Sequence, residues 1–265
     1  MMNIIRADLY RVSKSKVFKI AVLLSAVSAI SVACLLYLVS KGSVAQDMFV
    51  KFSLLVDTFL VPFLSSLVIG SLISQDFESK NIHDEIAAGN GRNAIVVAKL
   101  CSSMILTGCI VLTYALVTVL GIASRISFAK YVGIPSVFFG ILGDASEGAL
   151  SGQTFHTCIG LCCLMVLIYA ARVSLYLPIA FKTRKTVPVV LVAILSTFGF
   201  DILYALFRNV KGASEALKFL PYTITNDISL HASSATLIEA VCASVVFMNI
   251  MFSITKGYFR KAEIK

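Results

Sequence analysis

The chain has 265 residues, of which 58% are hydrophobic and 14% are charged. Water-soluble domains have about a quarter of their residues charged, so this composition excludes an ordinary soluble protein. The formal net charge of +9 would suit nucleic acid, but the basic residues are spread over short connections between long apolar runs. We therefore expect membrane topology to explain the charge, and we expect no nucleic-acid partner.

Before the first apolar run, the segment 1–16 has the pattern of an amphipathic helix. Its apolar residues recur at helical spacing: Ile4, Ile5, Leu9 and Val12. Its charged residues occupy the other side: Arg6, Asp8, Arg11 and Lys14. This pattern predicts a basic helix in the plane of the lipid headgroups, and a disordered basic tail is the alternative.

Six apolar runs then follow, and each is long enough to cross a bilayer. They are Val17–Val39, Phe52–Ser74, Leu100–Ala123, Ile159–Phe181, Val187–Phe207 and Leu237–Thr255. At about 1.5 Å per residue, each forms a helix of roughly 30 Å. We predict an all-α polytopic membrane protein with an interfacial helix (1–16), a six-span membrane domain (17–255) and a basic cytoplasmic tail (256–265).

The basic residues predict the orientation of these spans. If the N-terminus is cytoplasmic, the inner segments hold 14 of the 23 Lys and Arg residues and the outer segments hold 7. The remaining two, Lys19 and Arg172, fall within spans. By the positive-inside rule, both termini of this multi-pass cell-membrane protein lie in the cytoplasm.

The connection Gln75–Lys99 is the most structured segment predicted between spans. Asp76 can cap a helix start, and one apolar side is supplied by Phe77, Ile82 and Ile86. The sequence Gly89-Asn90-Gly91 ends the helix, and Arg92 leads back toward the third span. These residues predict a short helix lying across the cytoplasmic face.

Catalytic motifs are absent from the sequence. It contains no HExxH, GxSxG or GxxxxGK[ST] pattern, and its three histidines, His83, His156 and His231, fall in separate connections. We expect no catalytic residues, no metal site and no cofactor in this chain. Any uphill transport would take its energy from a partner or from an ion gradient.

The connection after the second span resembles the corresponding loop of bacterial permeases of the type-2 ABC exporter class. That family pattern has an acidic-aromatic start, a Gly-Thr-Ile-like turn, an aliphatic residue, a Gly, an Arg and a Lys that re-enters the membrane. The residues that match are Asp76, Phe77, Ile82, Ile86, Gly89, Arg92 and Lys99. The usual Gly-Thr is replaced by Lys80-Asn81. The whole layout is also similar, including the outer loop Leu220-Pro221-Tyr222 before the last span.

The resemblance implies a permease subunit that pairs with a second permease, either a copy of itself or a homologue. A separate cytoplasmic ABC ATPase subunit, which binds ATP and Mg²⁺, would dock on the short helix. In that arrangement Phe77, Ile82 and Ile86 would enter a partner groove, while Glu78, Asp84 and Glu85 would meet basic residues on its rim. The resemblance favours export of amphipathic or antimicrobial peptides, as in bacteriocin-immunity and phenol-soluble-modulin-type systems, with drug or lipid export as alternatives.

Three of the charged residues inside the predicted spans are candidates for function. Asp57 is a candidate for the translocation path, with a structural role as the alternative. Arg172 and Asp201 fall at similar depths in the fourth and fifth spans, so we predict an ion pair between them. A water-filled substrate path is the alternative for that pair.

Two other classes of function remain open from the sequence. An ion-gradient-driven secondary transporter would normally have inverted repeats and dense acidic residues in its spans, and neither is evident. A non-transporting membrane sensor or scaffold would have little need for charges inside its spans.

Overall fold

The computed structural model describes residues 1–131, 136–147, 152–207, 210, 212, 217, 219–230 and 232–261. This part of the chain is all-helical, with 82% of residues in helices and no strand. Six of its helical segments are long and apolar enough to cross a membrane: Lys16–Ser40, Asp57–Glu78, Arg92–Ala123, Phe155–Thr183, Thr186–Phe207 and Ser234–Arg260. The six predicted spans are therefore confirmed as elements.

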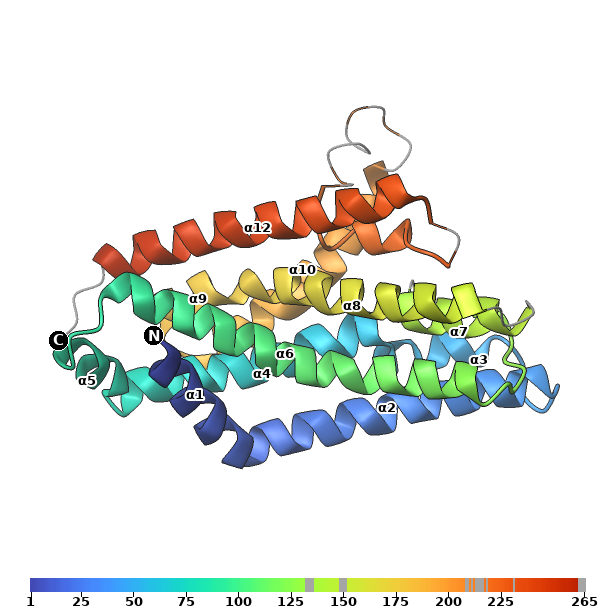
Figure 1. Cartoon of the computed structure of the whole chain (residues 1–265), viewed down its shortest axis with the longest axis horizontal. Helices are drawn as coiled ribbons and strands as arrows, with labels where there is room; N and C mark the ends of the chain where they lie inside the picture. Colours follow the sequence, from blue (N-terminus) through green and yellow to red (C-terminus); the bar gives the residue numbers. More distant parts are fainter. Residues whose placement is uncertain are drawn as a thin grey trace.

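The helices form an elongated bundle (Figure 1). In chain order the long ones are α2 (Lys16–Ser40), α4 (Asp57–Glu78), α6 (Arg92–Ala123), α8 (Gly152–Ser174), α10 (Thr186–Phe207) and α12 (Ser234–Lys261). The shorter ones are α1 (Met2–Lys14), α3 (Met48–Lys51), η1 (Ser53–Leu55), α5 (Asn81–Ala87), α7 (Val137–Glu147), α9 (Tyr176–Thr183) and η2 (Ile224–Asn226).

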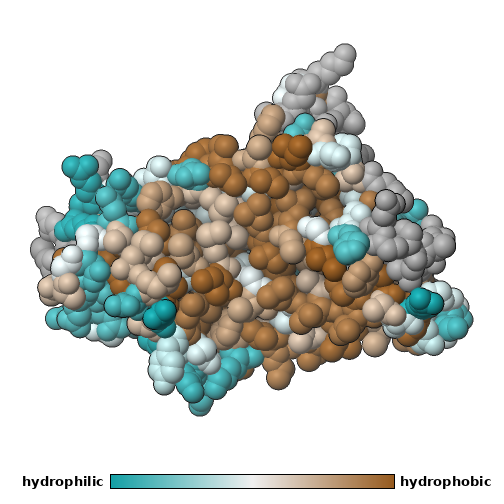
Figure 2. All heavy atoms as spheres, viewed as in Figure 1, coloured by the Kyte–Doolittle hydropathy of each residue, from teal (hydrophilic) through white to brown (hydrophobic). Residues whose placement is uncertain are grey.

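Burial separates central from peripheral spans. The apolar windows of α4 and of the α8–α9 span are 72% and 61% buried, whereas those of α10 and α12 are 17% and 22% buried. The peripheral helices expose apolar side chains, and Figure 2 shows a hydrophobic band between two hydrophilic ends. Apolar surface on this scale needs lipid or another apolar partner, as in a multi-pass membrane protein.

Several helix boundaries differ from the sequence prediction. The second span begins at Asp57 and not at Phe52, because Val56 is extended and the short elements α3 and η1 precede it. The third span begins at Arg92, well before the predicted Leu100. The sixth continues to Lys261, so residues 256–261 of the predicted tail are helical, and 262–265 lie outside the described residues.

The N-terminus and the end of α12 lie at the same end of the bundle, together with α5 (Figure 1). A kink separates α1 from α2, since Ser15 is extended and its side chain caps α2 by accepting a hydrogen bond from the Phe18 amide. The apolar side of α1 packs on the bundle through Ile4 and Ile5, which are buried in its core. Contact with the headgroup plane through its other side stays a prediction.

The connection after α6 contains α7, which packs against the bundle. Helix α7 buries Phe138, Phe139, Ile141 and Leu142 in the main apolar core. It is therefore part of the bundle, because these four apolar side chains find their partners there.

Candidate functional site

A buried cluster of charges joins four helices at the end of the bundle that holds α5. Its members are Asp8 and Arg11 on α1, Asp76 on α4, Glu85 on α5 and Lys99 on α6. We call these five residues the Lys99 cluster. They are separated by up to 91 positions in sequence, so only the packing of the helices brings them together.

Lys99 is at the centre of this cluster and is completely buried. Its ammonium lies 2.7 Å from Asp8 Oδ1, 2.7 Å from Asp76 Oδ2 and 3.3 Å from Glu85 Oε1. Lysine has three N–H donors, so one ammonium can serve three carboxylates. A lysine two turns inside a span is thereby compensated by acids from three other helices.

Arg11 supplies the second positive charge. Its guanidinium lies 2.5 Å from Asp76 Oδ1 and 3.4 Å from Asp8 Oδ1. Burial raises the pKa of Asp8, although Lys99 acts in the opposite direction. Burial alone would lower the pKa of Arg11, but its hydrogen bond to Asp76 raises that pKa overall. The cluster holds three acids against two bases, and it has no spare positive charge.

The predicted apolar anchors of the connection pack on the protein to different extents. Ile82 is fully buried in the same core as Ile4 and Ile5. Phe77 meets Phe181 edge-on at 6.0 Å between ring centroids, and the Arg184 guanidinium lies 4.9 Å from the Phe77 centroid. Ile82 is therefore not available to a partner groove, since the bundle already provides its apolar partners, and contact of the partly exposed Phe77 and Ile86 with a partner stays a prediction.

The outward surface of this region is polar. Glu78 and Asp84 are exposed, whereas Ile86 is partly buried and packs on the core. Glu85 faces Lys99, so of the three acids expected at a partner's rim only Glu78 and Asp84 are free to meet one.

Two backbone positions set the orientation of α5. Lys80, which stands where the resembling family has Gly, adopts the left-handed conformation with φ 58° before the helix begins. Gly89 adopts φ 85° after it ends, a conformation that glycine reaches without strain. The chain thus turns sharply on both sides of a helix of seven residues.

Arg92 joins the start of α6 to the end of α12. Its guanidinium donates to the carbonyls of Phe259 and Arg260 at 3.4 and 2.8 Å. These carbonyls belong to the last turn of α12, which lacks intrahelical donors. The arginine that the resemblance singles out therefore caps the last span of this chain.

Arg172 does not pair with Asp201. No ion pair within 4.0 Å joins them in the described structure. Arg172 is buried and donates instead to the Pro221 and Tyr222 carbonyls, at 2.9 Å each, and to Thr225 Oγ1 at 2.7 Å. The predicted pair considered only the two spans, whereas the outer loop folds back into the bundle and satisfies the guanidinium.

Asp57 lies in the first turn of α4 and is completely buried. The Tyr169 hydroxyl donates to it at 2.6 Å, and the Ser136 hydroxyl donates to its other oxygen. A helix N-terminus also favours a carboxylate. Asp57 is therefore an anchor joining α4 to α8 and to the residue before α7. It does not line either apolar groove described below.

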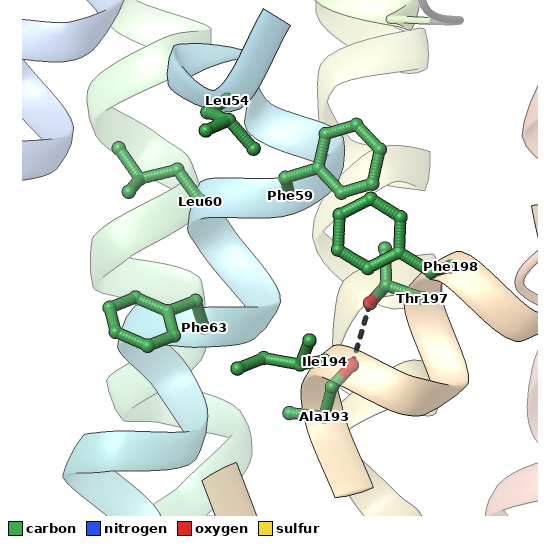
Figure 3. Close-up of a pocket in the computed structure, with 8 residues that line it drawn as sticks. All are labelled: Leu54, Phe59, Leu60, Phe63, Ala193, Ile194, Thr197 and Phe198. Carbon is green, nitrogen blue, oxygen red and sulfur yellow. Dashed lines mark hydrogen bonds between the residues drawn. The ribbon is translucent and has the colours of Figure 1, made fainter. Parts of the chain in front are cut away.

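An apolar groove of about 290 Å³ lies between α4 and α10 (Figure 3). Its lining residues are Leu54, Phe59, Leu60, Phe63, Ala193, Ile194, Thr197 and Phe198. The rings of Phe59 and Phe198 stack across it with centroids 4.7 Å apart, and the Thr197 hydroxyl bonds to Ala193 of its own helix at 2.9 Å. The groove therefore offers apolar contact without free polar groups. Sequence reasoning missed it, because nothing in the two runs indicates which faces meet.

Comparison with known proteins assigns no family: no protein-family model matches the chain, and no curated protein is significantly similar to it. Within the described residues, no group of three or more His, Cys, Asp or Glu side chains could hold a metal ion.

Proposed function

We propose that this chain is the permease subunit of an ATP-driven ABC exporter. It would pair with a second permease, and a separate cytoplasmic ATPase subunit would supply the energy. The observation that carries the proposal is the Lys99 cluster, which ties the short helix α5 to α1, α4 and α6 through buried charges.

A helix that receives movement from a partner must be fixed to the spans it drives. An exposed ion pair is worth about 0–1 kcal/mol and would yield, whereas removing one partner of a buried pair costs roughly 3–5 kcal/mol. Lys99 is fully buried together with Asp8 and Asp76, and Glu85 of α5 is mostly buried beside it. A displacement of α5 would therefore move the adjoining ends of α4 and α6 with it.

The docking surface in this proposal is the polar outer side of α5 and the turn before it. Glu78 and Asp84 are exposed there and would meet basic residues of the ATPase subunit. Ile82 would act from inside, by fixing the helix to the core.

The transport path would include the groove between α4 and α10. Helix α10 is the least buried span, so a second permease packed beside it would enclose this groove. The lining is apolar and aromatic, which suits the apolar face of an amphipathic or antimicrobial peptide. Peptide export is therefore the substrate class that we propose.

Transport by inside-out membrane vesicles tests the proposal. Vesicles that contain the chain and an ABC ATPase encoded beside it should accumulate a fluorescent cationic amphipathic peptide when ATP is added. Vesicles with an ATPase variant that cannot hydrolyse ATP should not. Equal accumulation in both would contradict the assignment.

An ion-driven secondary transporter is the second candidate, and the buried carboxylate of Asp57 is the observation that favours it. A carboxylate at the membrane level can carry a proton or bind a cation. In the same vesicles, peptide accumulation driven by an imposed pH gradient without ATP, and lost in Asp57→Asn, would support this candidate.

A further inference from the structure

A second apolar groove, of about 350 Å³, lies between α2 and α6. Its lining residues are Ile30, Ala33, Cys34, Tyr37, Val117, Leu120, Gly121, Ser124, Ile126 and Phe128. Ile30 and Leu120 are each more than half exposed, so the groove opens sideways from the bundle. It is formed by different helices from the groove between α4 and α10.

The groove begins where both helices stop. Helices α2 and α6 run in the same direction and end at the end of the bundle opposite α5 (Figure 1). The segment after α6 crosses to α2, where the Ser40 hydroxyl donates to the Ser127 carbonyl at 2.9 Å and the Ala129 amide donates to the Leu36 carbonyl at 3.1 Å. From Ile30 to Tyr37 the wall follows two turns of α2, about 10 Å along the membrane normal.

Positive charges gather where the groove meets the water. Lys41 directly follows α2, its ammonium lying 5.7 Å from the ring centroid of the lining residue Tyr37. Arg125 directly follows the lining residue Ser124, and Lys130 ends the crossing segment; all three cations are exposed. The sequence has no Asp or Glu from Ile30 to Gln46 or from Val117 to Gly143. The carbonyl ends of two helices contribute about half a negative charge each, which three full positive charges outweigh.

We propose that this groove binds an acyl chain of an anionic phospholipid, whose headgroup meets Lys41 and Arg125. The apolar walls accept any acyl chain, so they supply affinity without selectivity. The cations distinguish the lipids, because a net negative headgroup gains about fivefold in affinity for each basic residue near the membrane surface. A zwitterionic phospholipid of the same chain length gains little from them.

The absence of tryptophan from the chain allows a direct test by fluorescence quenching. Ile126→Trp places a single reporter in the groove, and Ile238→Trp places one on the exposed face of α12, near the same end of the bundle. Each variant is reconstituted in phosphatidylcholine vesicles that contain brominated phosphatidylglycerol or brominated phosphatidylcholine with identical acyl chains.

We expect the groove reporter to be quenched preferentially by brominated phosphatidylglycerol and the α12 reporter to be quenched equally by both lipids. The variant Lys41→Gln/Arg125→Gln should lower the preference at the groove about fivefold for each charge removed. High salt should lower the preference for phosphatidylglycerol in the protein that keeps Lys41 and Arg125, without any change in the fold. If the two brominated lipids quenched the groove reporter equally, as they should quench the α12 reporter, the proposal would be overturned. A groove reporter that neither lipid quenches would also overturn it, since protein would then cover the groove.

Discussion

At the scale of single residues, Lys99 and Arg172 show two ways to hold a charge within a membrane bundle. Lys99 is surrounded by carboxylates from other helices. Arg172 is surrounded by carbonyls of a folded-back loop, with its guanidinium 5.1 and 5.4 Å from the ring centroids of Tyr169 and Tyr222. The planar fork of arginine can use several fixed acceptors at once, whereas the compact ammonium of lysine favours acidic partners.

The variant Lys99→Met should strongly destabilise the folded protein, because three carboxylates would remain with only Arg11 to balance them. We expect a loss of about 3–5 kcal/mol in the free energy of unfolding. Adding Asp8→Asn should restore part of that loss, since it removes one of the uncompensated charges. Thermal unfolding of the detergent-extracted protein, followed by far-UV circular dichroism, measures both effects.

Lys51→Met is the matched control for this prediction. Lys51 lies 4.0 Å from Asp47, and both side chains are about two-thirds exposed. Exposed pairs contribute about 0–1 kcal/mol, so its unfolding temperature should remain nearly unchanged. If Lys99→Met and Lys51→Met were equally stable, the Lys99 cluster would not fix α5 to the bundle.

At the scale of elements, the sequence predicts helices better than it predicts their faces. Long apolar runs predicted all six spans, because a continuous apolar segment of about 20 residues satisfies its backbone groups inside a membrane as a helix. The direction of Ile82 could not be predicted, since an apolar stripe on a short helix fits a partner groove and the core of the same protein equally well. The role of Asp8 was missed for a similar reason: its partner Lys99 is distant in sequence, and a lone acid on a basic helix gives no sign of it.

The inner and outer sides of α5 should respond differently to substitution. Ile82→Ala removes a fully buried side chain and should lower the free energy of unfolding by about 2–5 kcal/mol. Glu78→Lys/Asp84→Lys changes only exposed residues, so the permease should stay folded but lose its ATPase subunit and ATP-driven transport. Co-purification with the tagged ATPase, together with the unfolding temperature of each variant, separates the two effects.

Asp47→Lys provides the control for each single exchange, Glu78→Lys or Asp84→Lys, because it makes the same charge reversal at an exposed position at the opposite end of the bundle. It should affect neither ATPase binding nor stability. Full ATPase binding by Glu78→Lys/Asp84→Lys would place the docking surface elsewhere on the molecule.

At the scale of the whole molecule, the path of the helices puts both ends of the bundle's chain on one side, and the distribution of basic residues predicts that this side is cytoplasmic. An even number of spans brings the N-terminus and the end of α12 to one end, where α5 also lies (Figure 1), and the segments predicted at this end hold 14 of the 23 Lys and Arg residues. The positions of individual segments relative to the membrane and the core were less predictable. The second span starts at Asp57 and α7 packs in the core, because hydropathy reports how apolar a segment is and not what it contacts.

Single cysteines at the two ends of the bundle test this topology in a cysteine-free background. Ser79 lies in the exposed turn before α5 and Ser43 in the exposed turn after α2, and each is replaced singly by cysteine. The positive-inside rule places Ser79 in the cytoplasm. Ser43→Cys should therefore react with a membrane-impermeant maleimide in intact cells, and Ser79→Cys should react only after the cells are opened. The reverse pattern would put α5 outside, beyond the reach of any cytoplasmic ATPase, and the proposed export function would fail with it.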